Sequence, residues 1–277
     1  MEIDAEVAPP GQGPPATGGG LVVESVLRAL RLLECFGSGE PELPLSLLSR
    51  RSGFSKTTTH RLLTTLVAGG WLERTPTSTY RLTIKAFQTG SVLVESLDVT
   101  QVAPPLLTRL SMESGQTTYL VVAAGCDAVC LERVSVGARI RVLELEIGGS
   151  QPLHVGGAPR ALLAFDEAAL LPAVLARGLP ASTSATLTSE AALVADLAAT
   201  RARGYAVSDG DSTVGVAAIG APVFGHGDQV VGAISLGGIR ADVIPPRPDH
   251  VEALLRTAAA MSTRLGSRRT AVSPAAR

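Results

Sequence analysis

The residues best suited to contact another molecule lie between Ser55 and Arg61, where the chain reads SKTTTHR. Arginine binds a guanine edge or a phosphate with two parallel hydrogen bonds, lysine suits a phosphate, and threonine offers a hydroxyl and a methyl group to bases. Consecutive β-branched threonines are poor helix formers, so an exposed helix needs a reason to keep them. We expect the following side chains to contact DNA: Ser55, Lys56, Thr57, Thr58, His60 and Arg61.

Apolar residues at helical spacing place this stretch at the start of a helix. Residues 45–48 predict a short helix that Gly53 closes with a turn, and Ser55 suits the N-cap of the next helix, which turns Leu62, Leu63 and Leu66 inward. Threonines at a helix start also satisfy the free N–H groups there, and this alternative stays open for Thr57 and Thr58.

The sequence also predicts a helix before these two helices and a β-hairpin after them. Apolar residues between positions 22 and 35 predict the first helix, and residues 71–82 read as two strands around a polar turn. This is the winged helix-turn-helix order, in which the helix after the turn enters the major groove. Arg74 and Arg81 flank the wing, where they either contact phosphate or the minor groove or are simply exposed to solvent.

Charge is divided unevenly along the 277 residues. Residues 21–85 hold nine basic and five acidic side chains, a net charge of +4, which leaves −5 for the remainder of a chain whose total is −1. The overall charge gives no basic field for indiscriminate nucleic-acid binding, so a DNA-binding surface must be local. A basic module joined to an acidic one is typical of a nucleic-acid reader with a second function.

The larger module mixes helices and strands. Apolar periodicity after Leu82 predicts a linker helix and a second helix, broken at Pro104-Pro105. Strand-like segments at 116–125, 128–134, 139–148, 205–209, 216–224 and 229–238 mix with helical ones at 157–165, 167–178, 188–204 and 249–266. The short loop at 225–228 indicates a hairpin, so we expect an α+β fold whose sheet is at least partly antiparallel.

No catalytic or metal-binding set emerges from the residues. The four histidines stand outside any nucleophile or metal motif, and we predict that Cys126 and Cys130 are buried structural thiols rather than a metal or redox pair. A hydrolase built on Ser208, Asp209, Asp211 and His154 is the enzymatic alternative, but carboxylates and hydroxyls so closely spaced more often form a hydrogen-bonded turn. We therefore expect no enzyme, no cofactor and no metal.

Motifs in both modules, in this order, resemble the IclR family of bacterial transcription regulators over residues 21–266. The reader segment SLLSRRSGFSKTTTHRLLTTLVAGGWLER is followed by PLHVGGAPRALLA, ARGYAVSDGDSTVGVAAIGAPVF and VVGAISLGG. The central family motif corresponds to Gly204, Ser208, Asp211, Ala218, Ile219, Gly220, Val223 and Phe224. Asp211 stands where the family usually has Glu, and Arg160 stands within its common Gly-Lys-Ala element.

The resemblance implies a winged helix-turn-helix domain (21–83), a linker helix (84–100) and a GAF-like α/β effector-binding domain with an antiparallel sheet (101–266), between disordered tails at 1–20 and 267–277. Family members bind small organic acids or related metabolites. The pocket positions carried over from the family are Leu143, Gly157, Ala158, Ser208, Ala218, Ser235 and Gly237. We add Arg141 as a candidate carboxylate partner, with a solvated strand arginine as the alternative.

We therefore expect a cytoplasmic transcriptional regulator that binds double-stranded DNA at a pseudo-palindromic operator, as a homodimer or homotetramer, under control of a small-molecule effector. The chain has no run of about 18–20 apolar residues that would span a membrane. Besides the hydrolase, the other alternative is a constitutive DNA-binding protein whose larger domain only oligomerises.

Overall fold

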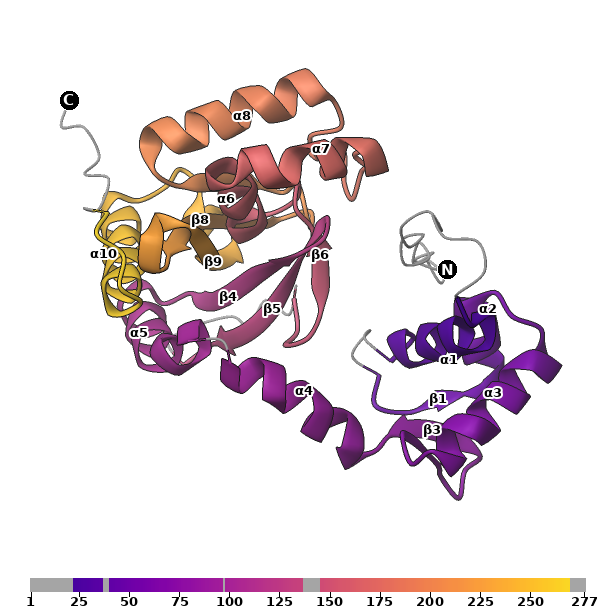
Figure 1. Ribbon diagram of the computed structural model, residues 1–277. Helices are drawn as coiled ribbons and strands as arrows, with labels where there is room; N and C mark the ends of the chain where they lie inside the picture. Colours follow the sequence, from indigo (N-terminus) through magenta and orange to yellow (C-terminus); the bar gives the residue numbers. More distant parts are fainter. Residues whose placement is uncertain (1–21, 37–39, 97, 137–144, 270–277) are drawn as a thin grey trace. The chain divides into compact units, whose positions relative to one another are not determined.

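The computed structural model describes residues 22–36, 40–96, 98–136 and 145–269 (Figure 1). Contacts divide the chain into two compact units, with the division between Val92 and Leu93. That division falls within helix α4 (Ile84–Ser96), in the segment expected to link the domains. The expected tail at 1–20 and residues 270–277 of the other tail lie outside the described residues.

The first unit has the predicted order of helix, helix, turn, helix and hairpin. Its elements are α1 (Glu24–Glu34), β1 (Leu43–Pro44), α2 (Leu45–Ser52), α3 (Lys56–Ala68), β2 (Leu72–Arg74) and β3 (Thr79–Leu82). The three strands form an antiparallel sheet in the order β1-β3-β2, so the structure adds β1 to the expected two-stranded wing. Gly53 ends α2 at a φ of 75°, a left-handed conformation that glycine adopts without steric cost.

Leucine side chains from each helix hold this unit together. Leu32 of α1, Leu48 of α2 and Leu63 of α3 are fully buried, and they pack with Leu72 and Tyr80 of the wing. Burying each such side chain stabilises the fold by about 1.5–3 kcal/mol relative to leaving it exposed. The three helices are thereby fixed as one support for the exposed start of α3.

The second unit is built on a six-stranded sheet whose order is β6-β5-β4-β9-β8-β7, with every neighbouring pair antiparallel. Its strands are β4 (Thr117–Ala124), β5 (Asp127–Val134), β6 (Ser150–Pro152), β7 (Ala206–Asp209), β8 (Val216–Phe224) and β9 (Val230–Ile239). The short connection between β8 and β9 contains the 3-10 turn η1 (His226–Asp228) and confirms the predicted hairpin.

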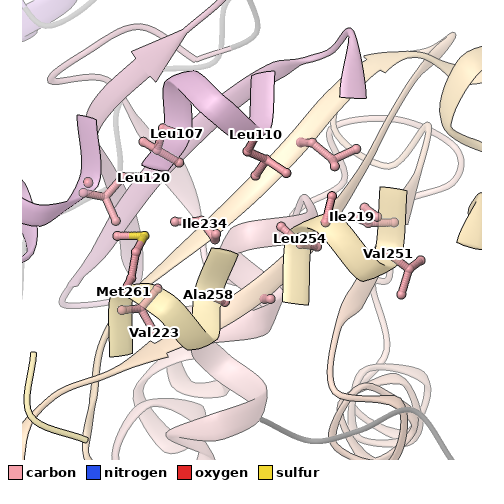
Figure 2. Packing of buried hydrophobic residues seen from close by; sticks show 14 of the residues in the cluster. Leu107, Leu110, Leu120, Ile219, Val223, Ile234, Val251, Leu254, Ala258 and Met261 are labelled. Carbon is pink, nitrogen blue, oxygen red and sulfur yellow. The ribbon is translucent and has the colours of Figure 1, made fainter. Parts of the chain in front are cut away.

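Helices cover both faces of this sheet. They are α5 (Asp98–Ser114), α6 (Gly157–Phe165), α7 (Glu167–Arg177), α8 (Glu190–Arg203), α9 (Arg240–Val243) and α10 (Pro248–Arg264). Leu107 and Leu110 of α5 and Leu254 of α10 pack on Ile219 and Ile234 of the strands in one apolar cluster (Figure 2). A second cluster joins α6, α7 and α8 to the other face. The mixed α+β fold class predicted from the sequence is confirmed.

The prediction of a helix break at Pro104-Pro105 is wrong, because α5 runs through both prolines. Val99, Ala103, Leu107 and Leu110 follow one another at helical spacing and are all buried against the sheet. Two missing backbone donors are costly, but the burial of this apolar face keeps the segment helical.

Candidate functional site

The start of α3 exposes five of the six predicted DNA-contacting residues, and Thr58 is half-buried. Ser55 caps the helix, since its hydroxyl oxygen accepts a hydrogen bond from the Thr58 backbone N–H (3.2 Å) and its hydroxyl lies 3.0 Å from that of Thr58. Thr59 is fully buried and donates to the Ser55 carbonyl oxygen (3.0 Å). The run of threonines therefore also serves the helix itself, as the alternative interpretation allowed.

Four of the predicted residues meet around one shallow surface hollow. Lys56, Thr57, His60 and Arg61 line it together with Leu45 at the start of α2, and its volume is about 390 Å³. All four are exposed. Two cations, a hydroxyl and an imidazole on one exposed helix face are suited to phosphate oxygens and base edges.

The wing arginines differ in how far they are already paired. Arg81 forms ion pairs with Glu73 and Glu42, whereas Arg74 donates to the Ser78 hydroxyl (3.1 Å). A phosphate would have to compete with two carboxylates for Arg81. On α2, Arg50 is exposed and has no ion pair within the described residues. Arg50 was not among the DNA-contacting residues predicted from the sequence, although the first helix of such a motif crosses the DNA backbone.

In the second unit, strand pairing brings the strand residues expected to bind an effector onto one face of the sheet. Ser208 of β7 lies opposite Ala218 of β8, which lies opposite Gly237 of β9, and Ser235 lies opposite Gly220. Residues opposite one another on antiparallel strands share a face. The N-terminal end of α6, with Gly157 and Ala158, packs over this face. We call it the α6 face; Leu143 and Arg141 lie outside the described residues.

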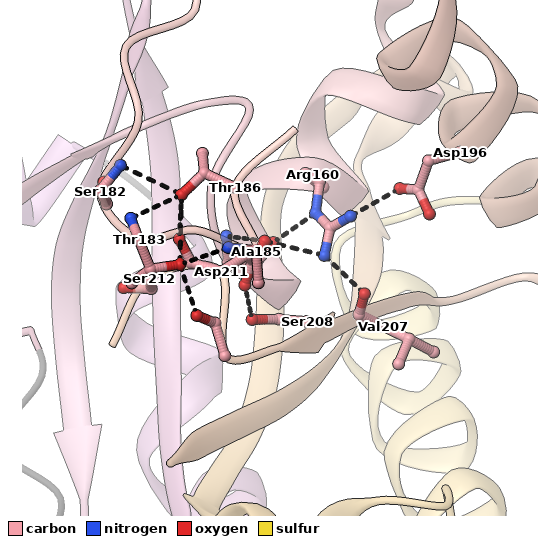
Figure 3. A network of polar contacts seen from close by, with 12 residues as sticks. Arg160, Ser182, Thr183, Ala185, Thr186, Asp196, Val207, Ser208, Asp211 and Ser212 are labelled. Atoms are coloured by element: carbon pink, nitrogen blue, oxygen red, sulfur yellow. Dashed lines mark hydrogen bonds and ion pairs between the residues drawn. The ribbon is translucent and has the colours of Figure 1, made fainter. Parts of the chain in front are cut away.

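A buried polar network ties α6 to the strands beside it (Figure 3). Arg160 is 4% exposed, and its guanidinium pairs with Asp196 (2.9 Å) and Asp211 (3.0 Å) and donates to the Val207 carbonyl. Asp211 also accepts from the Gly156 backbone N–H (3.2 Å) and the Ser208 hydroxyl. A buried ion pair persists only where further hydrogen bonds satisfy its members, and both members have them here.

Thr186 extends this network into the segment after α7. Its hydroxyl donates to the Asp211 carbonyl oxygen (2.7 Å) and accepts from the backbone N–H groups of Ser182 and Thr183. Thr183 in turn donates to the Gly210 carbonyl oxygen (2.7 Å). The loop between β7 and β8 is therefore fixed from two sides, by α6 and by residues 182–186.

The residues of the alternative hydrolase are engaged elsewhere. Ser208 donates to Asp211, and Asp209 pairs with Arg240 through both carboxylate oxygens. His154 is fully buried with its Nε2 atom 3.0 Å from the Pro180 carbonyl oxygen, and its Nδ1 atom has no hydrogen-bond partner in the described parts of the chain. Burial lowers the pKa of His154. Ser208 therefore meets a carboxylate that Arg160 already neutralises, and among the described residues His154 contacts the Pro180 carbonyl oxygen rather than Ser208.

The cysteines are free thiols. Cys130 is buried and burial raises the pKa of its thiol to about 11, whereas Cys126 is half-buried. Within the residues that the structure describes, no group of three or more His, Cys, Asp or Glu side chains is placed to hold a metal ion. No helix of the described ranges is long and apolar enough to span a bilayer.

Together, a winged helix-turn-helix unit and an α+β unit with an antiparallel sheet define a DNA-binding regulator with a separate effector domain. Comparison with known families agrees: residues 25–76 match the IclR helix-turn-helix domain, and residues 91–263 match the bacterial transcriptional regulator IclR C-terminal domain. The chain belongs to the IclR family of transcriptional regulators. It is a DNA-binding transcriptional regulator.

Individual relatives match over most of their length. The HTH-type transcriptional regulator XynR of Escherichia coli is 35% identical over 224 residues, which cover 80% of this chain and 88% of XynR. The transcriptional repressor IclR of Escherichia coli is 32% identical over 249 residues, 88% of this chain and 89% of the repressor. An IclR homologue from Microbacterium hydrocarbonoxydans, crystallised with 4-hydroxybenzoate, is 26% identical with a TM-score of 0.74 and covers 87% of this chain and 98% of its own.

Proposed function

We propose that α3 reads operator DNA through the exposed residues at its start. The observation that carries this proposal is the surface hollow in which Lys56, Thr57, His60 and Arg61 lie together beside Leu45. Arg61 reads a base edge and Lys56 contacts a phosphate, while Ser55 and Thr58 hold the helix start in place. Arg50 of α2 and Arg74 of the wing bind the phosphate backbone on either side.

The chain acts as a homodimer whose contact includes α1. Val26, Leu27 and Leu30 are 53%, 49% and 48% exposed, and with Val22 and Val23 before the helix they lie on one side of it. So large an apolar surface on a charged DNA-binding unit fits a protein contact. A second copy of the same helix would pair with it, and two readers related by a two-fold axis require a pseudo-palindromic operator.

The α6 face of the second unit binds a small organic acid or related metabolite. Two observations support this location: small residues line the strands at Ala218 and Gly237, and the first turn of α6 has no side-chain cap. Leu143, Gly157, Ala158, Ser208 and Ser235 complete the proposed set. The likeness to a homologue crystallised with 4-hydroxybenzoate supports a carboxylate ligand of this size.

Effector binding changes DNA affinity through α4, which joins the two units. A ligand shifts such an equilibrium only if it binds the DNA-competent and incompetent arrangements with different affinity. The protein has no catalytic role in this scheme. It acts in the cytoplasm, where it binds its operator DNA.

Selection of genomic fragments from the source organism by the purified protein, at physiological salt, tests the proposal. We expect one short inverted repeat to be enriched by the wild type and lost with Arg61→Ala. Arg109→Ala is the matched control, because Arg109 is 72% exposed on α5 in the other unit. Equal enrichment by Arg61→Ala would remove α3 from the interface. Enrichment that no metabolite changes would favour the constitutive DNA-binding alternative.

A further inference from the structure

Strand pairing places Arg133 on the α6 face, beside the proposed effector positions. Arg133 of β5 lies opposite Tyr119 of β4, and Tyr119 lies opposite Ser235 of β9. The three residues form one row across three neighbouring strands. Because strands are about 4.8 Å apart, the Cα atoms of Arg133 and Ser235 are separated by about 10 Å, within reach of one bound molecule of metabolite size.

The guanidinium of Arg133 carries one buried donor without a partner. Its Nη1 atom is buried and has no hydrogen-bond partner within the residues that the structure describes. A buried cationic donor without a partner destabilises a fold, so its presence needs an explanation. Arg160 of α6 shows the usual solution, since Asp196 and Asp211 pair with its guanidinium.

We propose that Arg133 binds the carboxylate of the effector. This inference rests on the proposed function of the α6 face and deepens it by naming the group that selects an acid over its neutral analogues. A planar guanidinium donates two parallel hydrogen bonds to a carboxylate, and burial strengthens them. Ser235, two strands away in the same row, binds a second polar group of the same ligand.

The surroundings of Arg133 favour a small anion over a permanent protein partner. Glu132, its neighbour in sequence, lies opposite Leu120, whose side chain belongs to the cluster on the other face of the sheet. One Glu132 oxygen accepts from the Arg133 backbone N–H (3.3 Å), not from its guanidinium. Glu132 therefore faces away from the α6 face.

Thermal unfolding with paired ligands tests this assignment. The probes are 4-hydroxybenzoate, benzoate, propanoate and succinate, each compared with its amide, and the shift in Tm measures affinity. For at least one acid we expect a rise in Tm with the wild type that its amide does not reproduce. Arg133→Gln should weaken that acid at least tenfold, and Arg133→Lys should weaken it less.

Two further variants provide the comparison. Arg109→Gln removes an exposed arginine from α5 and should bind the acid like the wild type. Arg141→Gln tests the other arginine considered for this role. The ligand-free Tm of Arg133→Gln should equal or exceed that of the wild type, because the variant removes a buried donor that has no hydrogen-bond partner among the described residues. A structural role would instead lower it.

Each contrary result has its own meaning. Retained acid binding in Arg133→Gln, or its loss only in Arg141→Gln, overturns the assignment. Equal protection by acids and amides that Ser235→Leu abolishes overturns it too, but leaves the α6 face as the effector site. If neither Arg133→Gln nor Ser235→Leu changes acid binding, both the assignment of Arg133 and the α6 face as the effector site are overturned. If no acid protects the wild type, the carboxylate class is wrong, while DNA capture still tests the regulator.

Discussion

Gly157 and Gly220 are in direct backbone contact where the first turn of α6 crosses β8. A Cβ atom added to Gly220 would lie 2.4 Å from the carbonyl carbon of Gly157 and 2.5 Å from the Ala158 nitrogen. Real Cβ atoms do not approach backbone so closely, so only glycine at position 220 permits this crossing. The contact sets the distance between α6 and the sheet face proposed to bind the effector.

Substituting Gly220→Ala should lower the free energy of unfolding of the second unit by about 1–3 kcal/mol, the usual cost of overpacking. Circular dichroism during denaturation measures this change. The only tryptophan, Trp71, lies in the first unit, so its fluorescence should show that unit unchanged. Gly90→Ala is the control: nothing lies within 4 Å of a Cβ there, and alanine in the exposed helix α4 should be neutral or stabilise by about 0.5–1 kcal/mol. Equal effects at both positions would contradict the close crossing.

Removing the buried carboxylate of Asp211 should cost about 3 kcal/mol in stability of the second unit. Asp211→Ala deprives Arg160, Ser208 and the Gly156 N–H of a common partner, while Asp196 still faces Arg160. Asp209→Ala, only two residues away, breaks a surface pair with Arg240 whose members are 39% and 55% exposed. That control should change stability by less than about 1 kcal/mol. Similar losses for both aspartates in urea denaturation would contradict the network.

The reader was predictable because its signals are local. Gly53, the Ser55 cap and the leucines of α3 each act on residues a few positions away, and each appears where predicted. Thr59, which the predicted DNA-contacting set leaves out, is fully buried.

The polar network and the site residues of the second unit could not be predicted in full, because they depend on contacts between residues far apart in the sequence. Arg160 and Asp211 are 51 positions apart, and no local pattern links them. Arg133 looks like any solvated strand arginine until the register with Tyr119 assigns it to the α6 face. The proline pair misled the prediction because local helix propensity was outweighed by burial of α5.

Acid should destabilise the second unit through its buried histidines. Burial lowers the pKa of both His154 and His250, so each is neutral in the folded chain over a range where the unfolded chain is already protonated. The associated stability is complete above the ordinary histidine pKa of about 6.5 and is lost as pH falls below it. His154→Gln keeps a donor for the Pro180 carbonyl and should flatten the decline in Tm between about pH 6.5 and 5. An unaltered slope in His154→Gln would contradict the assignment.

A charge on the apolar side of α1 should separate the proposed dimer. Leu30→Glu places a carboxylate on a surface that a second copy would bury, where an unpaired charge is costly. Sedimentation should show a lower association constant by at least tenfold, with Trp71 fluorescence and circular dichroism unchanged. Met112→Glu is the matched control, since Met112 is 64% exposed on α5 in the other unit. If Leu30→Glu sediments like the wild type, α1 is not the contact.

Lys56 and Arg61 should weaken DNA binding in different ways. Neutralising a phosphate contact at Lys56→Ala should weaken binding to all sequences about equally and reduce the slope of log K against log salt by about 1. Arg61→Ala should cost about 1–3 kcal/mol at the specific site and relax the preference at one base position, since a base contact carries sequence information. Fluorescence anisotropy between 50 and 200 mM salt, on the selected operator and its single-base variants, measures both effects, with Arg28→Ala on α1 as the control for an exposed cation. A uniform loss with a shallower salt slope for Arg61→Ala would assign Arg61 to a phosphate instead, because only a base-reading side chain discriminates among the variants.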